Sequence, residues 1–499
     1  MSTGTGTLPA TKTPKWLVPV LFVCMAVWPL FMHLDTLPLR MWDEARQAIS
    51  ALEMFDSGNW LVAHFYGQPD MWSTKPPLLI WLQTALFAII GPGELALRLP
   101  SAIAAFFTGW FLLRITKGAL DAPWLGLLAA VILYTNEGYI HMHVARSGDY
   151  DALLILFMTT SAWALFRWSI DGNNRHLLWF FLLLALGVLT KSVQALLFLP
   201  GLGIYLLVRK RFIALFKQRT TYVGLGIFVL LVGGFYLLRE SANPGYLQAV
   251  WDNELGGRYG ASLEGHEGPW NFYINMLLDH HFTAWWMLVP VGILVGLLHR
   301  DERIRQWTLL LVCMGTCYLY IISSAGTKLE WYEAPLFPIL AGLAAIPLHL
   351  LLQWTFSENW SPSAVGRNIL PWVLLFVAFV GPYSSTIGRV FFPQEYPWDV
   401  PVYKGAHYLH KAVRGGPLEA NVLCHDNYNA HLIFYVDVLK RQGKSLESVS
   451  KHDLQPGMRA MATEWNVKET IEHDYDQRII FEDEPLRIYE IIAKHADTP

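Results

Sequence analysis

The chain has 499 residues, and only 15% of them are charged, whereas about 25% is typical of a soluble protein. The net charge of −3 argues against a large nucleic-acid-binding surface. Hydrophobic residues make up 54% of the chain and gather in runs of roughly 16–20 residues, close to the length that crosses the hydrocarbon core of a bilayer. Composition therefore indicates a polytopic membrane protein, and it leaves a transporter, a channel and a membrane enzyme open.

Eleven apolar runs are predicted to span the membrane. In chain order they are residues 16–33, 96–115, 122–140, 150–168, 176–190, 192–208, 222–239, 282–299, 306–324, 333–352 and 368–388. We interpret the first run as a retained span, because it has no small-residue cleavage site. The run at 78–91 has 14 residues, which is short for a span, so it is predicted to be a helix lying near the membrane surface.

The lysines and arginines of the loops predict the orientation of these spans. With the N-terminus in the cytoplasm, every strongly basic loop falls on the cytoplasmic side, as the positive-inside rule requires. These loops hold Arg114, Lys117, Arg167, Arg175, Arg209, Lys210, Arg211, Lys217, Arg219, Arg300, Arg303 and Arg305. The odd number of spans then places the segments 34–95 and 240–281 and the tail outside. The sequence thus predicts an inner-membrane domain at 1–388 and a soluble periplasmic domain at 389–499.

The tail differs from the rest of the chain in composition. It is polar, roughly 110 residues long, and contains the short strand-like runs NVLCH, HLIFYV, RIIFE and RIYEII, with helix-like stretches between them. A segment of this size can bury its own small core. The predicted fold is therefore a mainly α, polytopic membrane protein with a small C-terminal α/β domain outside the membrane.

The first external segment carries candidate catalytic residues directly after the first span. Asp43 and Glu44 are adjacent, so their side chains do not share a helix face. One carboxylate can face a cavity while the other orients it or binds an ion, and a simple charged loop is the alternative. Lys75, which precedes two prolines, either extends to lipid head groups or holds a phosphate as a point charge.

A second group of polar residues surrounds the start of the span at 150–168. It contains His141, His143, Arg146, Asp149 and Asp151. Carboxylates are favourable near a helix N-terminus, so helix capping is an alternative to catalysis for the two aspartates. The histidines are two residues apart, a spacing that suits a strand better than a helical metal site.

The remaining outer turns also present cations and aromatic residues. Lys191 lies in a very short turn, where it must reach the interface or neutralise an anion. The loop at 240–281 contains Arg258, His266 and Tyr273, and its glycines and aromatics suit a segment that covers a substrate. Tyr332 lies at the next outer turn, beside Lys328.

Cations on the outer side need an explanation, because that side is normally poor in lysine and arginine. Most outer turns nevertheless present one: Lys75, Arg146, Lys191, Arg258 and Lys328. A phosphate or pyrophosphate bound at the outer leaflet would account for them.

Several motifs in this order resemble a known family. They are DEARQAISALEMFDSGNW, TKPPLLIW, RLPSAIAAFFTG, ARSGDYDALL, the LTK turn at 189–191 and KLEWYEAPLFPILAGLAA, and they cover roughly residues 16–352. The pattern resembles the aminoarabinose transferase and protein O-mannosyltransferase superfamily, glycosyltransferases of the C fold class that use polyprenyl-phosphate sugars. The resemblance implies a bacterial inner-membrane enzyme and does not specify the sugar.

The resemblance also implies roles for the outer residues. Asp43 would deprotonate the acceptor hydroxyl, with Glu44 as its neighbour in the acidic pair. Asp151 would be a second essential acid, and Asp149 an additional one. The lipid phosphate would be held by Lys75, helped by two residues, Arg258 and Tyr332.

The chain departs from the aminoarabinose transferases at three positions. Thr74 stands where those enzymes often have glutamate, Asn253 where a histidine is expected, and Ser192 where glycine is frequent. With these departures, the resemblance does not specify aminoarabinose as the sugar, lipid A as the acceptor or a metal at the position of Asn253. The resemblance to the superfamily as a whole is not affected.

The mechanism that this implies is one displacement that inverts the anomeric centre. Lys75 and Arg258 would neutralise the departing phosphate while Asp43 takes the acceptor proton. The acceptor is lipid A, another glycan or a protein, and a divalent metal is permitted without being required. A lipid-linked-sugar transporter or flippase, or a scaffold without catalysis, are the alternatives; a transporter should carry charges near span centres.

Overall fold

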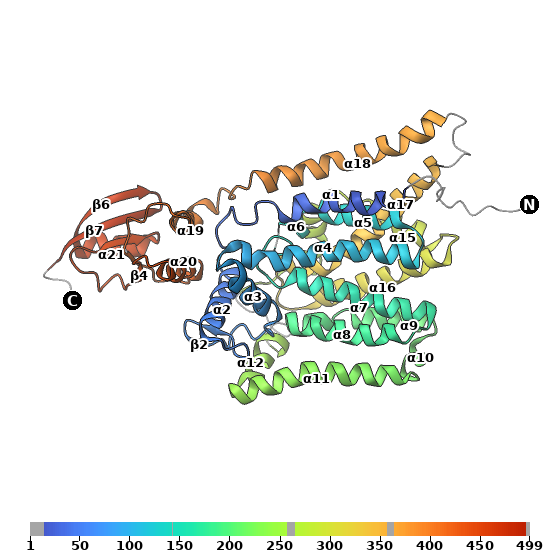
Figure 1. Cartoon of the computed structure of the whole chain (residues 1–499), viewed down its shortest axis with the longest axis horizontal. Coiled ribbons are helices and arrows are strands. Elements are labelled where there is room, and N and C mark those ends of the chain that lie inside the picture. Colours follow the sequence, from blue (N-terminus) through green and yellow to red (C-terminus); the bar gives the residue numbers. More distant parts are fainter. Residues whose placement is uncertain (1–13, 142, 257–264, 357–363, 496–499) are drawn as a thin grey trace, which may run out of the picture.

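The computed structural model describes residues 14–141, 143–256, 265–356 and 364–495. Long helices lie side by side in a bundle, and the strands of the C-terminal segment gather at one end of it (Figure 1). The two parts are in contact, because the same hydrophobic core contains residues of the second helix and of the C-terminal segment.

Within the described residues, seven helices are long and apolar enough to cross a membrane. They are Glu94–Ala119 (α4), Asp151–Asp171 (α7), Arg175–Leu196 (α8 at Arg175–Lys191 with η1 at Ser192–Leu196), Arg219–Ala242 (α11), Glu302–Ser324 (α16), Glu330–Thr355 (η4 at Glu330–Leu336 with α17 at Phe337–Phe356) and Ile369–Phe391 (in α18, Ala364–Phe391). Five shorter apolar helices are Leu17–Phe31 (α1), Leu78–Ile90 (α3), Pro123–Tyr134 (α5), Leu199–Val208 (α9) and Leu288–Leu297 (α15). All of these except α3 coincide with the predicted spans, so the predicted fold class is confirmed.

The two ends of the bundle carry different segments. The helices α2 (Asp43–Ser57), α3 and α12 (Tyr246–Val250) lie at the same end as the C-terminal strands, and α10 (Phe212–Phe216), in the most basic loop, lies at the opposite end (Figure 1). The external segments are thus grouped as the charge pattern predicts. The assignment of the basic end to the cytoplasm stays a prediction.

The segment between α2 and α4 lies at the same end of the bundle as the C-terminal strands. It contains a two-stranded antiparallel hairpin, β1 (His64–Phe65) and β2 (Gln68–Pro69), followed by α3, which packs on α2 and α4. The predicted helix at 78–91 is confirmed as a helix, and its position near the membrane surface stays a prediction. Further short elements are α6 (Glu137–Ile140), η2 (Trp251–Gly256), α14 (Phe272–Met276) and η3 (Leu277–His281).

The C-terminal domain is a five-stranded mixed sheet in the order β4-β3-β5-β7-β6. The strands β3, β4 and β5 are parallel, and β7 pairs antiparallel with both β5 and β6. The elements are α19 (Val400–Val413), β3 (Val422–Leu423), α20 (Ala430–Arg441), β4 (Glu447–Ser448), β5 (Arg459–Ala462), α21 (Trp465–Asp474), β6 (Tyr475–Asp483) and β7 (Leu486–Lys494). The predicted α/β domain is confirmed.

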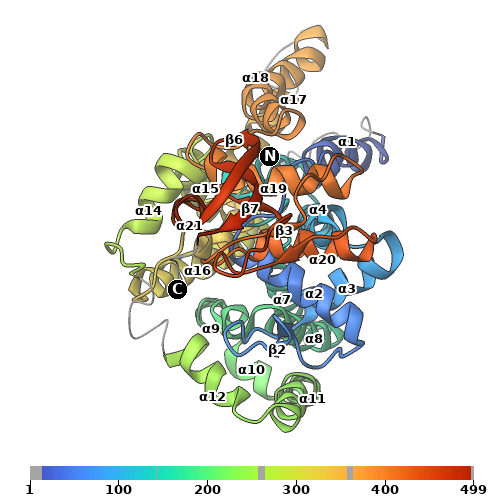
Figure 2. The same cartoon turned by 90° about the vertical axis from the view of Figure 1, so that its left-hand side faces the viewer.

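One predicted strand is wrong. The run HLIFYV lies in helix α20, whereas the runs RIIFE and RIYEII lie in β6 and β7. A short apolar run that is buried on several sides does not distinguish a helix from a strand. The helix packs on α2, and its Leu432 and Phe434 share a core with Ala48 and Leu52 (Figure 2).

Polar contacts hold the C-terminal domain to the end of the bundle that carries α2. Arg40 donates two hydrogen bonds to Glu395, at 2.5 and 2.7 Å, and His407 contacts the same carboxylate at 2.9 Å. Tyr435 in α20 donates to Glu94 at the start of α4 and accepts from the backbone of Leu39. The domain is therefore bound to the segments on both sides of α2.

Candidate active site

Asp43 is the first residue of α2, the helix at the end of the bundle that carries the C-terminal domain. Its side chain is partly buried and lies at the positive end of the helix dipole. Trp42, the preceding residue, has φ 70° and ψ −118°, an uncommon conformation for a bulky residue. The chain therefore turns sharply just before the carboxylate that the sequence singled out.

Two segments that are distant in sequence bring three polar side chains together at this point. One side-chain atom each of Asp43, His143 and Asp149 lies within 4.8 Å of the others. The His143 Nδ1 is 2.8 Å from Asp149 Oδ2, and Gln47 donates to Asp149 Oδ1 at 3.1 Å. The His143 ring stacks on Trp331, with centroids 4.0 Å apart. The imidazole is thus held between an aromatic face and a carboxylate.

Electrostatic interactions within this group shift the pKa values of Asp149 and His143. Burial by itself would raise the pKa of Asp149, but the hydrogen bond with His143 and the charge of Lys191 outweigh it and lower the pKa well below its usual range. Burial likewise opposes a charge on His143, whereas the bond to Asp149 raises the pKa of the imidazole. His143 and Lys191 thus stabilise the ionised form of Asp149, and Asp43 lies beside this pair.

The same three residues fit a divalent cation. Two carboxylates and one imidazole are ligands that Zn²⁺, Mn²⁺ and related ions accept, and one atom of each lies within 4.8 Å of the others. His141 is not part of this group, in keeping with the expectation that its spacing from His143 does not suit a metal site. The sequence indicated each member of this group, but not the combination.

Glu44 points away from Asp43 into a buried network. Its carboxylate accepts two hydrogen bonds of 2.8 Å from Arg98 and further bonds from the backbone of Gly148, at 2.7 Å, and of Arg40, at 2.8 Å. Burial alone would raise the pKa of Glu44, but the charge and hydrogen bonds of Arg98 outweigh it and lower the pKa. Glu44 therefore ties the segment that bears His143 and Asp149 to α2.

Asp151 and Lys191 form a buried ion pair. The Nζ atom of Lys191 lies 2.6 and 2.7 Å from the two carboxylate oxygens of Asp151, and both side chains are at least 95% buried. Lys191 thus neutralises a carboxylate of its own chain, which corrects the prediction that it binds a substrate phosphate. Ser192, directly after it, has φ 49°, a conformation that glycine adopts more easily and that explains why glycine suits this turn.

Lys75 lies on the loop between β2 and α3. Its Nζ is 3.7 Å from Glu254 and 5.8 Å from the centre of the Tyr150 ring. The loop is anchored by Asp70, which accepts two backbone N–H bonds of 3.0 Å from the following turn, and by Asn253, which donates to the carbonyl of Met71 at 2.9 Å. Asn253 therefore supports the lysine loop at the position where the sequence resemblance led us to expect histidine.

Three kinds of comparison identify the fold. Residues 74–235 match the model of the family described as dolichyl-phosphate-mannose-protein mannosyltransferase. The structure is similar to ArnT from Cupriavidus metallidurans bound to undecaprenyl phosphate, with a TM-score of 0.69 at 16% identity over 94% of this chain and 97% of that one. The fold is that of a C-class glycosyltransferase. The resemblance predicted from the sequence motifs is confirmed.

One further solved structure and two curated sequences are also similar to this chain. The archaeal oligosaccharyltransferase AglB from Archaeoglobus fulgidus has a TM-score of 0.52 at 12% identity, over 87% of this chain and 64% of that one. The undecaprenyl phosphate-alpha-4-amino-4-deoxy-L-arabinose arabinosyl transferase of Aeromonas salmonicida is 28% identical over 68% of this chain and 61% of its own length. That of Proteus mirabilis (transferase 1) is 24% identical over 70% and 60%. The matched region thus spans about three fifths of these curated relatives.

Two predicted phosphate ligands have other contacts in this C-class structure. The guanidinium of Arg146 donates to four carbonyl groups around the end of α1, among them those of Pro29 at 2.9 Å and Met32 at 2.7 Å, so it caps that helix instead of facing a substrate. The Nζ atom of Lys328 donates to the carbonyl of Ala325 at 2.8 Å, and its backbone N–H donates to His266. Arg146 is therefore withdrawn as a phosphate ligand.

The other predicted site residues differ in their burial. Tyr273 is fully buried in the core of the helical bundle, which corrects its prediction as a substrate-loop residue. His266 is exposed. The backbone carbonyl of Tyr332 accepts from Tyr318 at 2.9 Å, so the turn that bears it is held to α16. Arg258 lies outside the described residues.

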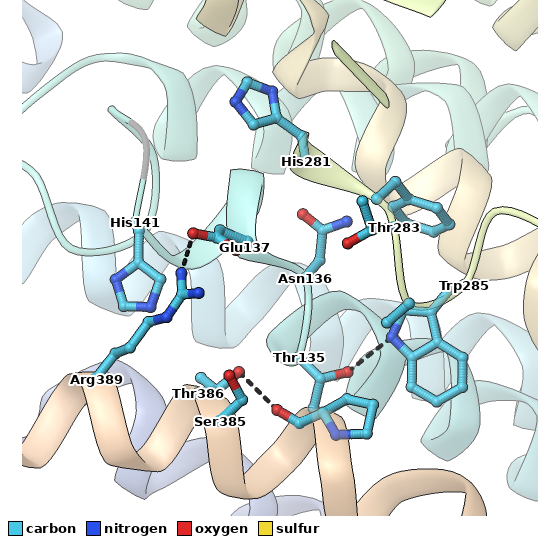
Figure 3. A pocket seen from close by; sticks show the side chains of 13 residues that line it. Thr135, Asn136, Glu137, His141, His281, Thr283, Trp285, Ser385, Thr386 and Arg389 are labelled. Atoms are coloured by element: carbon cyan, nitrogen blue, oxygen red, sulfur yellow. Dashed lines mark hydrogen bonds and ion pairs between the residues drawn. The ribbon is translucent and has the colours of Figure 1, made fainter. Parts of the chain in front are cut away.

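His141 lies in a separate polar cavity (Figure 3). The cavity has a volume of about 100 Å³ and lies between the segment around α6, the end of η3 and α18. Glu137 pairs there with Arg389, and His281 contacts Glu333 at 2.6 Å. Burial lowers the pKa of His141 to about 4, so its imidazole is neutral.

The sequence did not single out Arg98, Gln47 or Trp331, which support the site. Arg98 carried a usable signal, because an arginine inside an apolar helix is expected to have a buried partner. Gln47 lies one turn after Asp43 on the same helix face, at a spacing of four residues. Trp331 carried no signal, since its contact with His143 depends on the packing of η4 against α7.

Proposed function

We propose that this protein is a membrane glycosyltransferase that moves a sugar from a polyprenyl-phosphate donor to an acceptor at the outer face of the inner membrane. The observation that carries the proposal is the site itself: a carboxylate at the start of α2 stands beside a hydrogen-bonded His143–Asp149 pair, and Lys75 lies on the adjoining loop. The likeness to a structure that binds undecaprenyl phosphate supports this donor class. We propose accordingly that the C-terminal domain lies in the periplasm.

The chemistry assigned to the site is a single inverting displacement. Asp43 accepts the proton of the acceptor hydroxyl as that oxygen bonds to the anomeric carbon, and the bond from that carbon to the phosphate oxygen breaks. Lys75 stabilises the charge that develops on the departing phosphate. Its distance of 3.7 Å from Glu254 is longer than a charge-assisted hydrogen bond, so a phosphate can replace this partner. Arg258 and Tyr332 are proposed as further phosphate contacts, and Asp151 acts by fixing the end of α8.

A divalent cation is proposed at Asp43, His143 and Asp149. When bound, it would supply positive charge beside the acceptor hydroxyl and so favour its deprotonation. Dialysis against EDTA tests this: activity should fall and return with added Mn²⁺ or Zn²⁺, and the return should require His143. Unchanged activity of a demonstrably metal-free protein would contradict the proposal.

The sugar is proposed as a pentose or hexose carried on undecaprenyl phosphate. The curated relatives are named for 4-amino-4-deoxy-L-arabinose. Lipid A is the acceptor that the family resemblance implies, with another glycan or a protein as alternatives. Thr74 and Asn253 differ from the residues that the resemblance predicts beside Lys75, so we keep the proposal at the level of the donor class.

Mass analysis of lipid-linked and envelope glycans tests the proposal in cells that carry the natural chain or Asp43→Asn. A polyprenyl-phosphate sugar should accumulate with the variant while one envelope glycan loses that sugar, which identifies donor and acceptor together. Glu53→Gln, at a half-buried position ten residues later in the same helix, is the matched control. Unchanged pools in cells that contain the folded variant would favour a transporter or flippase.

A further inference from the structure

A tyrosine of the C-terminal domain contacts the residue directly before Asp43. The hydroxyl of Tyr428 donates to the backbone carbonyl of Trp42 at 3.1 Å, and the two rings are stacked, with centroids 4.7 Å apart and planes 7° apart. A bulky residue keeps a φ of 70°, as Trp42 does, only where its surroundings hold it there. Tyr428 therefore helps to fix the turn from which Asp43 projects.

The same tyrosine also contacts the segment that leads to Lys75. Its ring lies 6.1 Å from that of Phe65, at 17° between planes, and the guanidinium of Arg46 lies 4.1 Å above the Phe65 ring. Arg46 donates two bonds, of 2.7 and 2.8 Å, to Asp70, the residue that anchors the lysine loop. A continuous set of contacts thus joins the turn before Asp43 to the loop of Lys75, with Tyr428 between them.

The loop that presents Tyr428 is itself held in place. Glu464 accepts hydrogen bonds of 2.6 Å from the side chains of both Asn427 and Asn429, the two neighbours of Tyr428. Burial raises the pKa of Tyr428, so the hydroxyl stays protonated and able to donate. The C-terminal domain therefore offers a preformed contact, and the helix α20 that follows this loop packs on α2 (Figure 2).

We propose that Tyr428 is a positioning residue, through which the C-terminal domain sets Asp43 relative to the loop of Lys75. The inference rests on the proposed function. Asp43 and Lys75 are assigned to opposite sides of the same sugar carbon, so both act in one transition state only if their separation is correct. A displacement of about 1 Å can cost about a hundredfold in rate. The domain is thereby a part of the active site and not only a cover for it.

The test uses the full-length protein with substrates taken from cells. The donor is the polyprenyl-phosphate sugar that accumulates in Asp43→Asn cells, and the acceptor is the glycan fraction that lacks the sugar in those cells. Tyr428→Phe removes the hydrogen bond and keeps the ring, whereas Tyr428→Leu removes both. Tyr489→Phe is the control, because it removes one side-chain hydrogen bond, to Glu472, from the sheet of the same domain.

The expected result is a graded loss of kcat. We expect a fall of about threefold for Tyr428→Phe and about thirtyfold for Tyr428→Leu, with KM for the donor changed less than threefold and Tm equal to that of the control. In the background of Trp42→Ala, Tyr428→Leu should cost less than about twofold more, because both act through the same turn. A merely structural role would lower Tm and multiply the two losses.

The outcomes separate this inference from the proposed function. If no donor accumulates in Asp43→Asn cells, the glycosyltransferase proposal itself fails. If the natural chain transfers the sugar, Asp43→Asn does not, and Tyr428→Leu keeps the natural kcat, only the role of Tyr428 is overturned. A loss of kcat in Tyr489→Phe equal to that in Tyr428→Leu would also overturn it.

Discussion

Two carboxylates each begin a helix, α2 and α7, and their surroundings are opposite. Asp43, at the start of α2, is partly exposed and lies among groups that can exchange a proton or a metal. Asp151, at the start of α7, is fully buried, and both of its oxygens are bound by Lys191. The comparison shows that a helix N-terminus accommodates a carboxylate in either case, and that the partner decides whether the carboxylate remains available for chemistry.

Asp43→Asn gives the largest expected effect. Removal of a general base should lower kcat by about 10²–10⁴-fold, because the amide cannot accept the acceptor proton. The Tm in detergent should stay within about 2 °C of the natural chain, since the side chain is not part of a buried pair. Transfer assays and thermal unfolding check both values. A large fall in Tm would show that Asp43 is structural like Asp151 and would remove the contrast.

Lys191→Met tests the other half of the comparison. It leaves Asp151 buried without its cation, which should destabilise the protein by about 3–5 kcal/mol. The double variant Asp151→Leu with Lys191→Met should recover most of this loss, because an apolar pair replaces the ion pair at similar volume. Thermal unfolding in detergent measures both. Activity that is lost in a double variant of natural stability would show that the pair takes part in the reaction.

Lys75→Met sharpens the contrast between the two lysines. Lys75 has a weak partner at 3.7 Å, whereas Lys191 is fully paired. The loss of the charge that stabilises the departing phosphate should lower kcat by about a hundredfold, with stability unchanged. Lys75→Arg should retain part of the rate because it restores the charge. The assay is the same transfer reaction, and equal rates for the Met and Arg variants would contradict the role.

The smallest expected effect concerns the ion pair of Arg40 and Glu395, which lies outside the membrane-spanning helices and can exchange protons with the solvent. Burial alone would raise the pKa of Glu395, but Arg40 and His407 outweigh it and lower the pKa to about 2. Since the pKa is lowered from about 4.3 in the unfolded chain, this stabilisation is present above about pH 4.3 and is lost as the pH falls towards 2.

Glu395→Gln should therefore lower Tm by a few degrees at pH 7, and the difference from the natural chain should shrink as the pH falls below about 4. Thermal unfolding in detergent over this range checks the sign. The exposed pair of Lys404 and Asp483 provides the control, because Asp483→Asn should change Tm little at any pH. A difference that grows on acidification would contradict the assignment.

Parts of the fold followed directly from the sequence because they depend on local properties. The apolar runs predicted eleven helices, since a segment in hydrocarbon must satisfy its own backbone hydrogen bonds. The grouping of external segments at one end followed from the basic loops. The strand at HLIFYV was predicted wrongly. The run is apolar on most sides, so its sequence suits a buried strand and a buried helix equally, and it forms a helix that packs against α2.

For the site, the sequence indicated Asp43, Lys75, His143 and Asp149 one by one, through residue type and position beside a span. It also fixed that Asp43 and Glu44 face different directions, because adjacent helix positions must. Only the tertiary structure decided that Arg146 caps α1, that Lys191 neutralises Asp151, and that Tyr428 reaches the turn before Asp43. These contacts join residues far apart in the chain, and whether a charge is free or paired depends on which helices lie side by side, which local sequence does not encode.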